Sequence, residues 1–408
     1  MKILSIVDSF KNSLTSLEIS KLLQEEALKR NINLDYLPIS DGGDGFLDVI
    51  SFIIPGEFIK VSFTGFDGNL YENSYYVAND IAYIEVARFI GLHLTNKIKK
   101  DPKSYGTSEL GKVIKDVYQR GIRKIVIGLG GTATNDFGMG MLSELGFNFI
   151  NNSKITPNMS PRKFNENTLV VVSDEFIYRD LDFTIISDVK NELFGLEGAT
   201  YTFGPQKGIK NHELAHIETI GKDFSKKIID LEYNDTTKLP GAGAAGGLGF
   251  ALTSVFKAKI NSGINFILDL IDFDLLQNKY DIIITGEGKI DRQSLQGKVV
   301  FEIASRTSKN VVLICAINDL RIDEIPKSLN NIVKIESIVP KLASKEESLK
   351  NPRKYIRILA KKIFDEIWMP EVRKMIDKLD IEVINSLTIS ELYVLRYIDN
   401  NKERVLSS

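Results

Sequence analysis

Residues Lys124 to Gly140 read KIVIGLGGTATNDFGMG, and this stretch decides the fold class that the chain is expected to have. An apolar, β-branched run, typical of a buried strand, stops at glycines and is followed by hydroxyl and carboxylate side chains. Glycines allow the backbone to approach a ligand closely, threonines offer donors, and the N–H groups of a following helix favour negative charge. The residues concerned are Gly128, Gly130, Gly131, Thr132 and Thr134. We therefore expect a phosphate to bind at this turn of an α/β protein.

Three further stretches combine glycines or hydroxyls with carboxylates. They are DSFK at residues 8–11, SDGGDG at residues 40–45 and TGEGKID at residues 285–291. Asp8 and Asp291 lie at or just beyond the end of an apolar run. Because open parallel sheets bind ligands at the carboxyl ends of their strands, several carboxylates are expected to converge on one cleft.

The composition is that of an ordinary globular protein. The chain has 408 residues, of which 43% are hydrophobic and 26% charged, and its formal net charge is -2. A chain of this length is expected to form two domains. The charge balance and the lack of a long basic run argue against nucleic acid or an anionic membrane as partners. No apolar run is long enough to span a membrane, so a cytoplasmic location is expected. The single cysteine, Cys315, lies in the run VVLICAI and is interpreted as a buried, inert thiol.

Strand-like and helix-like patterns alternate along the chain, which predicts a parallel sheet. Thr15 and Glu18 have the spacing of a capping box at the start of a helix. Strands are predicted at residues 3–7, 34–39, 122–127, 281–285, 310–317 and 331–339, and helices from residue 16 and at 46–54, 106–121 and 299–308.

The domain organisation follows from this pattern. We expect two α/β domains with a cleft between them. Residues 1–55 and 258–368 form a Rossmann-like parallel-sheet domain, residues 56–257 form a second α/β domain inserted into it, and residues 369–408 form a helical extension.

Eight motifs occur in the order found in the bacterial glycerate kinases of the glyoxylate-pathway type (glycerate kinase type-1), and the chain resembles that family from Met1 to about Trp368. The motifs are DSFK, SDGGDG, IEVARFIGL, SYGTSEL, GLGGTATNDFG, FGPQKG, PGAGAAGGLG and ITGEGKIDRQSLQGK. The resemblance implies transfer of the γ-phosphate of ATP to D-glycerate, dependent on Mg²⁺, with the small-molecule substrates bound between two α/β domains. A homodimer is left open.

The resemblance also implies roles for individual residues. Phosphoryl transfer needs positioning and charge neutralisation more than covalent chemistry, so carboxylates and lysines should dominate the site. Asp188 is the expected base, and Asp8, Lys11 and Lys207 complete the catalytic set. Mg²⁺ ligands are expected among Asp8, Asp188 and Asp291. Substrate or phosphate binding is expected at Ser9, Asp41, Gly42, Gly43, Asp44, Gly128, Gly130, Gly131, Thr132, Thr134, Asn135, Asp136, Gly286, Glu287, Gly288 and Lys298, with Asp136 orienting a lysine or a metal-bound water.

Several residues depart from the family pattern, among them Phe137, Met139 and Arg88. Phe137 and Met139 stand where small residues are usual, which gives the anion-binding turn bulkier side chains. Arg88 occupies a position that is usually small or neutral, and it either binds a carboxylate or points to solvent.

Two other functions fit short patterns in the sequence. The GLGGTA turn matches a form of the dinucleotide fingerprint, which would indicate an NAD(P)-dependent oxidoreductase. HELAH at residues 212–216 matches the pattern of zinc metallopeptidases. Neither pattern has its full context in the sequence, so both are weaker hypotheses than the kinase.

Overall fold

The structure is a computed structural model that describes residues 1–376 with short gaps. The gaps are residues 11, 12, 41, 44, 96, 97, 99, 100, 175, 293, 297 and 298, and the side chains of residues 296, 322 and 367–376 are also not described. Four predicted site residues, Lys11, Asp41, Asp44 and Lys298, therefore lie outside the described residues, as does the predicted extension beyond residue 376.

The first sheet has five parallel strands in the order β14-β13-β12-β1-β2. Its strands are β1 (Lys2–Val7), β2 (Asn33–Tyr36), β12 (Ile282–Ile290), β13 (Asn310–Asn318) and β14 (Ile332–Val339). The central strands are near-continuous hydrophobic runs, because helices cover both faces of a parallel sheet. The predicted α/β fold class is confirmed, and the strands predicted at both ends of the chain belong to this sheet.

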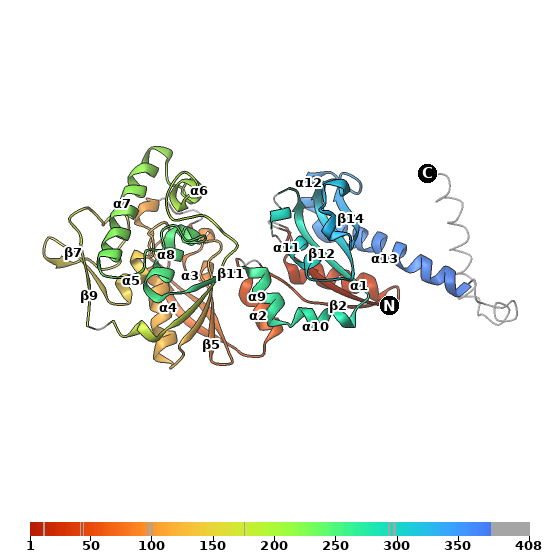
Figure 1. The fold of residues 1–408 in the computed structure, drawn as a ribbon, viewed down its shortest axis with the longest axis horizontal. Coiled ribbons are helices and arrows are strands. Elements are labelled where there is room, and N and C mark those ends of the chain that lie inside the picture. Colours follow the sequence, from red (N-terminus) through yellow and green to blue (C-terminus); the bar gives the residue numbers. More distant parts are fainter. Residues whose placement is uncertain are drawn as a thin grey trace.

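A second sheet has six strands in the order β11-β10-β6-β5-β4-β3, and the two sheets lie in different halves of the molecule (Figure 1). Its strands are β3 (Glu57–Thr64), β4 (Leu70–Ala78), β5 (Ile81–Glu85), β6 (Lys124–Gly128), β10 (Asp182–Ile186) and β11 (Lys259–Asn261). Strands β5, β6, β10 and β11 are parallel, whereas β3 and β4 pair antiparallel. Strands β7 (Phe147–Asn151), β8 (Lys154–Ile155) and β9 (Leu169–Val172) form a small third sheet.

The pairing of the strands can be compared with the two expected domains. Strands from residues 2–36 and 282–339 share the first sheet, while the segment between them supplies the other two. Strand β11 lies just after the expected boundary at residue 257 but pairs with β10 of the six-stranded sheet. The domain boundaries stay a prediction.

Helices fill the connections between the strands. They are α1 (Ser16–Leu28), α2 (Phe46–Ile53), α3 (Ala87–Ile90), α4 (Ser108–Gln119), α5 (Met139–Glu144), α6 (Ala199–Phe203), α7 (Asn211–Asp230), α8 (Ala244–Phe256), α9 (Gly263–Leu270), α10 (Phe273–Leu276), α11 (Val299–Ser305), α12 (Lys345–Lys350) and α13 (Pro352–Ile376). The predicted helices correspond to α1, α2, α4 and α11, and the capping box of Thr15 and Glu18 is present. In the part of the chain that the structure describes, no helix is long and apolar enough to cross a membrane.

The two larger sheets share part of their hydrophobic core. One cluster of buried side chains contains Leu4 and Ile283 from the first sheet, Phe46 and Ile50 from α2, and Tyr83 from the second sheet. Helix α2 therefore packs at the junction of the two sheets, directly after the SDGGDG loop. This packing fixes where that loop lies.

Cys315 is fully buried in β13, as the sequence predicts. Burial raises the pKa of its thiol to about 12, and the nearby charge of Glu287 acts in the same direction. A thiol with so high a pKa carries almost no thiolate at neutral pH and is a poor nucleophile.

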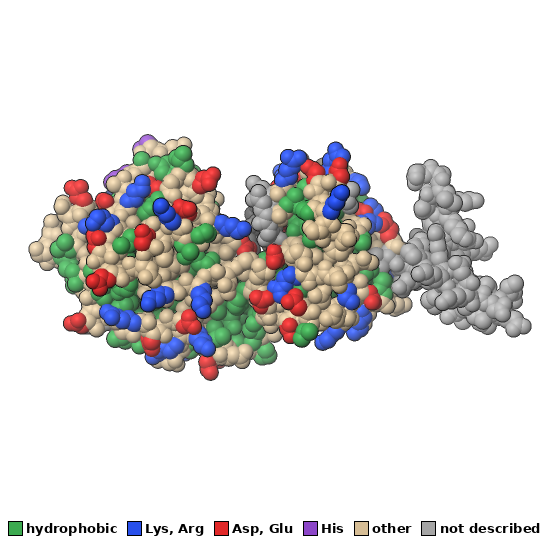
Figure 2. All heavy atoms as spheres, in the orientation of Figure 1, with side chains coloured by type: hydrophobic (Ala, Val, Ile, Leu, Met, Phe, Trp, Pro, Cys, Tyr) green, Lys and Arg blue, Asp and Glu red, His purple; other side chains and the backbone are tan. Residues whose placement is uncertain are grey.

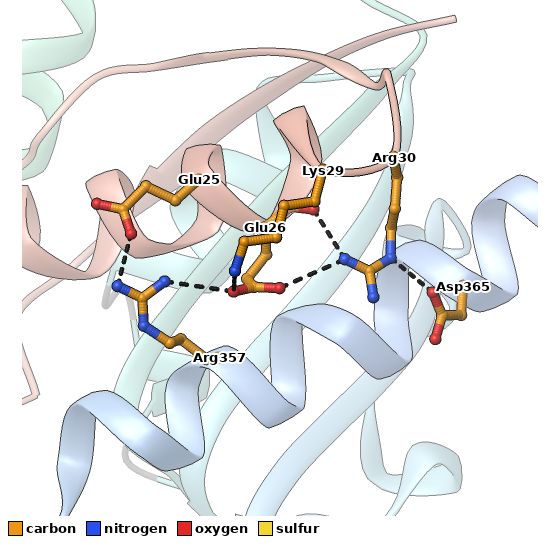
Figure 3. A network of polar contacts seen from close by, with 6 residues as sticks. All are labelled: Glu25, Glu26, Lys29, Arg30, Arg357 and Asp365. Carbon is orange, nitrogen blue, oxygen red and sulfur yellow. Dashed lines mark hydrogen bonds and ion pairs between the residues drawn. The ribbon is translucent and has the colours of Figure 1, made fainter.

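Charges of both signs are interspersed over the face shown in Figure 2. Figure 3 shows one network of such charges, which joins α1 to the long helix α13. The carboxylate of Glu26 lies 2.5 Å from Lys29 Nζ, 3.3 Å from Arg357 Nη1 and 3.4 Å from Arg30 Nη1. Arg30 in turn contacts Asp365 of α13 at 2.6 Å. Glu26 is thus the buried centre of a contact between segments that are far apart in the sequence.

We expect Glu26→Gln to lower the free energy of unfolding at neutral pH by about 1–2 kcal/mol, because three cations lose their shared carboxylate. Burial acts to raise the pKa of Glu26, but hydrogen bonds from Lys29 and Arg357 outweigh it and hold the pKa below its ordinary value of 4.5. Such a group stabilises the fold above pH 4.5, and this contribution disappears as the pH falls through the folded-state pKa. Urea titrations of both proteins should therefore converge at acidic pH.

The control for this prediction is Glu25→Gln, since the Glu25 side chain is 52% exposed and pairs with Arg357 at the edge of the same network. We expect the free energy of unfolding of this variant to change by less than about 1 kcal/mol. Equal losses in the two variants would show that burial of Glu26 adds nothing to its contribution.

Candidate active site

A cavity of about 900 Å³ is lined by residues that follow strands of both larger sheets. Around the first sheet it takes residues after β1, at the start of α1 and around the SDGGDG loop. Around the second sheet it takes the GLGG turn after β6, residues after β10, and the FGPQKG loop. Lining residues that the sequence predicted as site residues are Ser9, Gly43, Gly130, Gly131, Thr132, Asp188 and Lys207.

The residues that follow β6 and β10 line this cavity, and β5 ends in register with these two parallel strands. Glu85 of β5, Gly128 of β6 and Ile186 of β10 are partners in register, and Leu129 N donates to Ile186 O at 3.1 Å. Asp188 follows two residues after the end of β10. This is the edge at which parallel sheets place their ligands.

Four glycines that were predicted as site residues pack in two pairs and bring two loops together. A Cβ atom on Gly128 would lie 2.5 Å from Gly42 O, and one on Gly130 would lie 2.4 Å from Gly43 Cα. Gly130 N also donates to Gly42 O at 3.4 Å. These glycines therefore let the SDGGDG loop pack backbone to backbone against the GLGG turn, so that Gly43, Gly130 and Gly131 face the cavity together.

Lys207 is a buried cation on the cavity wall, only 6% exposed. Its Nζ donates to Thr134 O at 2.6 Å and to Thr132 Oγ1 at 3.2 Å. Burial lowers the pKa of Lys207 to about 7, although the charge of Asp136 acts in the opposite direction. The FGPQKG loop thus holds an amine that gains or loses its proton close to neutral pH.

Asp136 and Asn135 lie behind the cavity wall. Asp136 is fully buried and accepts hydrogen bonds from Thr107 N (2.7 Å), Thr107 Oγ1 (2.9 Å), Gly140 N (3.0 Å) and Gly138 N (3.2 Å). Burial raises its pKa, and these hydrogen bonds oppose the shift. Asn135 Nδ2 donates to Thr200 Oγ1 at 3.1 Å. Both side chains stabilise the turn that contains Thr132, which lines the cavity, and Thr134, which is fully buried.

Two predicted carboxylates lie at strand ends near the cavity. Asp188 lines it, and its Oδ1 accepts from Gly263 N at the start of α9 at 3.0 Å. Asp8 is 9% exposed; its N–H donates to Gly286 O at 2.8 Å, and its Oδ1 accepts from Ser9 N at 2.7 Å. Ser9 itself lines the cavity.

The remaining predicted residues belong to β12 or its end. Gly286, Glu287 and Gly288 lie within the strand, where Gly286 sits between β1 and β13. Asp291 lies 3.3 Å from Lys289 Nζ and lines a second pocket of about 640 Å³ together with Arg292 and other charged residues. The structure therefore does not bring Asp291 into the lining of the cavity that contains Asp188. Among the described residues, no group of three His, Cys, Asp or Glu side chains is arranged to hold a metal ion.

Some lining residues were missed from the sequence. Thr15 and Ser16 place the positive end of α1 at the cavity, and Gln206 precedes Lys207 in the FGPQKG loop. The capping box already indicated where α1 begins, and Gln206 stands inside a motif of the family. The sequence did not show that the start of α1 points toward the cavity.

The two bulky residues of the anion-binding turn point into the core instead of the cavity. Phe137 and Met139 are both fully buried, and the Phe137 ring packs 6.3 Å from the ring of Phe194. Phe137 has a φ of 56°, in the left-handed region, which explains why a glycine suits this position. Arg88 binds carboxylates of the protein itself, at 3.0 Å from Asp48 and 3.5 Å from Glu85.

We therefore expect Phe137→Leu to lower the free energy of unfolding by about 1–2 kcal/mol, through lost ring contacts, without changing KM for any substrate. Thermal unfolding and steady-state kinetics measure the two effects separately. A shifted KM in a folded variant would show that the Phe137 side chain does shape the substrate site.

Neither alternative function gains support from the structure. His212 and His216 are exposed on α7, and Glu213 between them pairs with Lys103. After the GLGGTA turn, helix α5 begins only at Met139, so the turn does not open a helix as a dinucleotide fingerprint does.

Known proteins resemble this chain over nearly its whole length. The model of the glycerate kinase family matches residues 3–368. A glycerate kinase of Neisseria meningitidis serogroup B is 34% identical over 379 residues, which cover 91% of this chain and 100% of the relative. A glycerate kinase of Bacillus subtilis is 31% identical over 376 residues, covering 89% and 97%. The crystal structure of a candidate glycerate kinase 2 from Salmonella typhimurium LT2 superimposes with a TM-score of 0.74 at 28% identity, covering 91% and 99%. The chain belongs to the glycerate kinase family.

Proposed function

We propose that this protein transfers the γ-phosphate of ATP to a hydroxyl of D-glycerate and that the reaction takes place in the cavity between the two larger sheets. The observation that carries the proposal is the wall on which Lys207 and Asp188 lie together with the GLGG turn. A cation, a carboxylate and closely approaching backbone are the groups that in-line phosphoryl transfer needs. Family membership supplies the substrate class.

The proposed roles follow from chemistry. Asp188 accepts the proton of the reacting hydroxyl, since its carboxylate reaches the cavity wall. Lys207 offers positive charge to a phosphate or to the glycerate carboxylate. Ser9, Gly43, Gly130, Gly131 and Thr132 bind the substrates along the same wall. Lys11, Asp41, Asp44 and Lys298 are expected to contribute on the grounds of their motifs alone.

The carboxylates of Asp188 and Asp8 fit Mg²⁺, which prefers hard oxygen ligands and takes one or two carboxylates beside substrate phosphates. Bound Mg²⁺ would supply neutralisation of charge on the phosphate oxygens. The assignment of Asp291 to the metal stays a prediction, as do the homodimer and the cytoplasmic location.

ADP release by the purified protein, with ATP and Mg²⁺, tests the proposal when D-glycerate is compared with L-glycerate and other small hydroxy acids. We expect turnover with D-glycerate to exceed the others. If only a different hydroxy acid supported turnover, the protein would still be a kinase, but D-glycerate would not be its substrate. Absence of ADP release with every acceptor would contradict the proposed function.

A further inference from the structure

Helix α2 begins directly after the SDGGDG loop, and two N–H groups at its start donate to a side chain of the six-stranded sheet. Its N-cap residue is Gly45, which has a φ of 84° and no side chain with which to cap the helix. Glu85, the last residue of β5, supplies the missing acceptors: its Oε1 accepts from Gly45 N at 3.3 Å and its Oε2 from Leu47 N at 3.1 Å. A carboxylate near the start of a helix also interacts favourably with the helix dipole.

Arg88 holds Glu85 and α2 together. Its Nε lies 3.5 Å from Glu85 Oε2, and its Nη2 lies 3.0 Å from Asp48 Oδ1 in the first turn of α2. Glu85 is 5% exposed, and a buried carboxylate is costly unless donors surround it. We name Glu85, Arg88 and Asp48 the Glu85 clamp.

The Glu85 clamp lies next to the contact between the two glycine loops. Glu85 is the register partner of Gly128, the residue against which Gly42 packs. Gly43, Gly45 and Asp48 line the cavity, whereas Glu85 and Arg88 are absent from its described lining. A shift at the start of α2 would therefore move the SDGGDG loop relative to the GLGG turn.

We propose that Glu85 is a positioning residue that holds the SDGGDG loop against the GLGG turn, and that Arg88 acts through Glu85 and Asp48. The inference rests on the proposed function, since it names the residues that hold two loops of that same site, the SDGGDG loop and the GLGG turn, in their relative positions. It also gives Arg88, which departs from the family pattern, a specific task.

Glu85→Gln tests this with little change of shape. A glutamine has only one acceptor oxygen, so either Gly45 N or Leu47 N loses its partner. We expect kcat to fall about tenfold to a hundredfold while KM for ATP and glycerate changes by less than about threefold, because misplaced groups impair the reacting geometry. Arg88→Met should lower kcat less. The double variant should resemble Glu85→Gln alone, since coupled residues give non-additive effects.

The matched control is Glu72→Gln, which removes a carboxylate that pairs with Lys60 on the exposed part of the same sheet. Wild-type kcat in folded Glu85→Gln overturns the proposal, and fully additive effects overturn the part concerning Arg88. Amide hydrogen exchange at Gly45 and Leu47 tests the clamp without any assay: faster exchange in Glu85→Gln supports it, and unchanged exchange overturns it. A wild-type protein that does not phosphorylate glycerate would refute the proposed function, while the exchange result would still decide the clamp.

Discussion

Lys207→Met is expected to lower kcat/KM by about a hundredfold to a thousandfold, the usual effect of removing one group that stabilises charge in a transition state. Lys207 lies on the cavity wall, and its Nζ is held by Thr132 Oγ1 and Thr134 O. Methionine has a similar length and no charge, so the variant should fill the same space. Lys210→Met is the control, because Lys210 is exposed three residues further along. A wild-type value of kcat/KM in Lys207→Met would show that this lysine has no role in the reaction.

The same variant should keep its stability or gain some. Burial lowers the pKa of Lys207 from 10.5 to about 7, so between these values the unfolded chain binds more protons than the folded one. Stability should therefore rise with pH across this window, and below it the charged lysine costs up to about 5 kcal/mol, partly offset by its hydrogen bonds. Lys207→Met should lack this rise. Urea titrations from neutral to alkaline pH measure it, and a parallel rise in both proteins would contradict the assignment.

Activity should show the opposite pH dependence. If Lys207 acts as a cation, kcat/KM of the free enzyme should fall as the pH rises through about 7, where the amine loses its proton. Stability and activity would then change in opposite directions with pH, which is the signature expected of a buried functional lysine.

Asp188→Asn is expected to lower kcat by about a thousandfold, within the range found when a general base is removed. The asparagine Oδ1 can still accept from Gly263 N, so the start of α9 should keep its place. KM should change far less than kcat, because the lost group acts on the reacting proton.

The control for Asp188→Asn lies on the same strand. Asp182 is the exposed first residue of β10, at the opposite end from the cavity, and Asp182→Asn should leave kcat unchanged. A loss of less than about tenfold in Asp188→Asn would move the role of base to another carboxylate.

Local signals in the sequence predicted the strands of the first sheet, strand β6 and four of the helices. The capping box of Thr15 and Glu18 placed the start of α1, and apolar runs placed the strands of the first sheet. The antiparallel strands β3 and β4 were not predicted, since their half-exposed faces give a weaker pattern than a buried parallel strand. Residues of the predicted DSFK, SDGGDG, GLGG and FGPQKG motifs line the cavity, whereas those of the TGEGKID stretch do not.

Contacts between distant segments were beyond the sequence. Nothing local indicates that Gly130 packs on Gly43, or that the Glu85 carboxylate caps a helix some forty residues earlier in the chain. Phe137 was expected to crowd the anion-binding turn, but its backbone dihedral angle sends the ring into the core. The sequence alone shows neither the backbone conformation of Phe137 nor the direction of its ring.

Phosphorus NMR of a mixture of the protein, ATP, Mg²⁺ and D-glycerate shows directly whether phosphate is transferred to glycerate. We expect a phosphomonoester resonance of a phosphoglycerate that grows in step with ADP, and the position of the phosphate identifies the hydroxyl that reacts. ADP accompanied only by inorganic phosphate, or no change in ATP, would contradict transfer to glycerate.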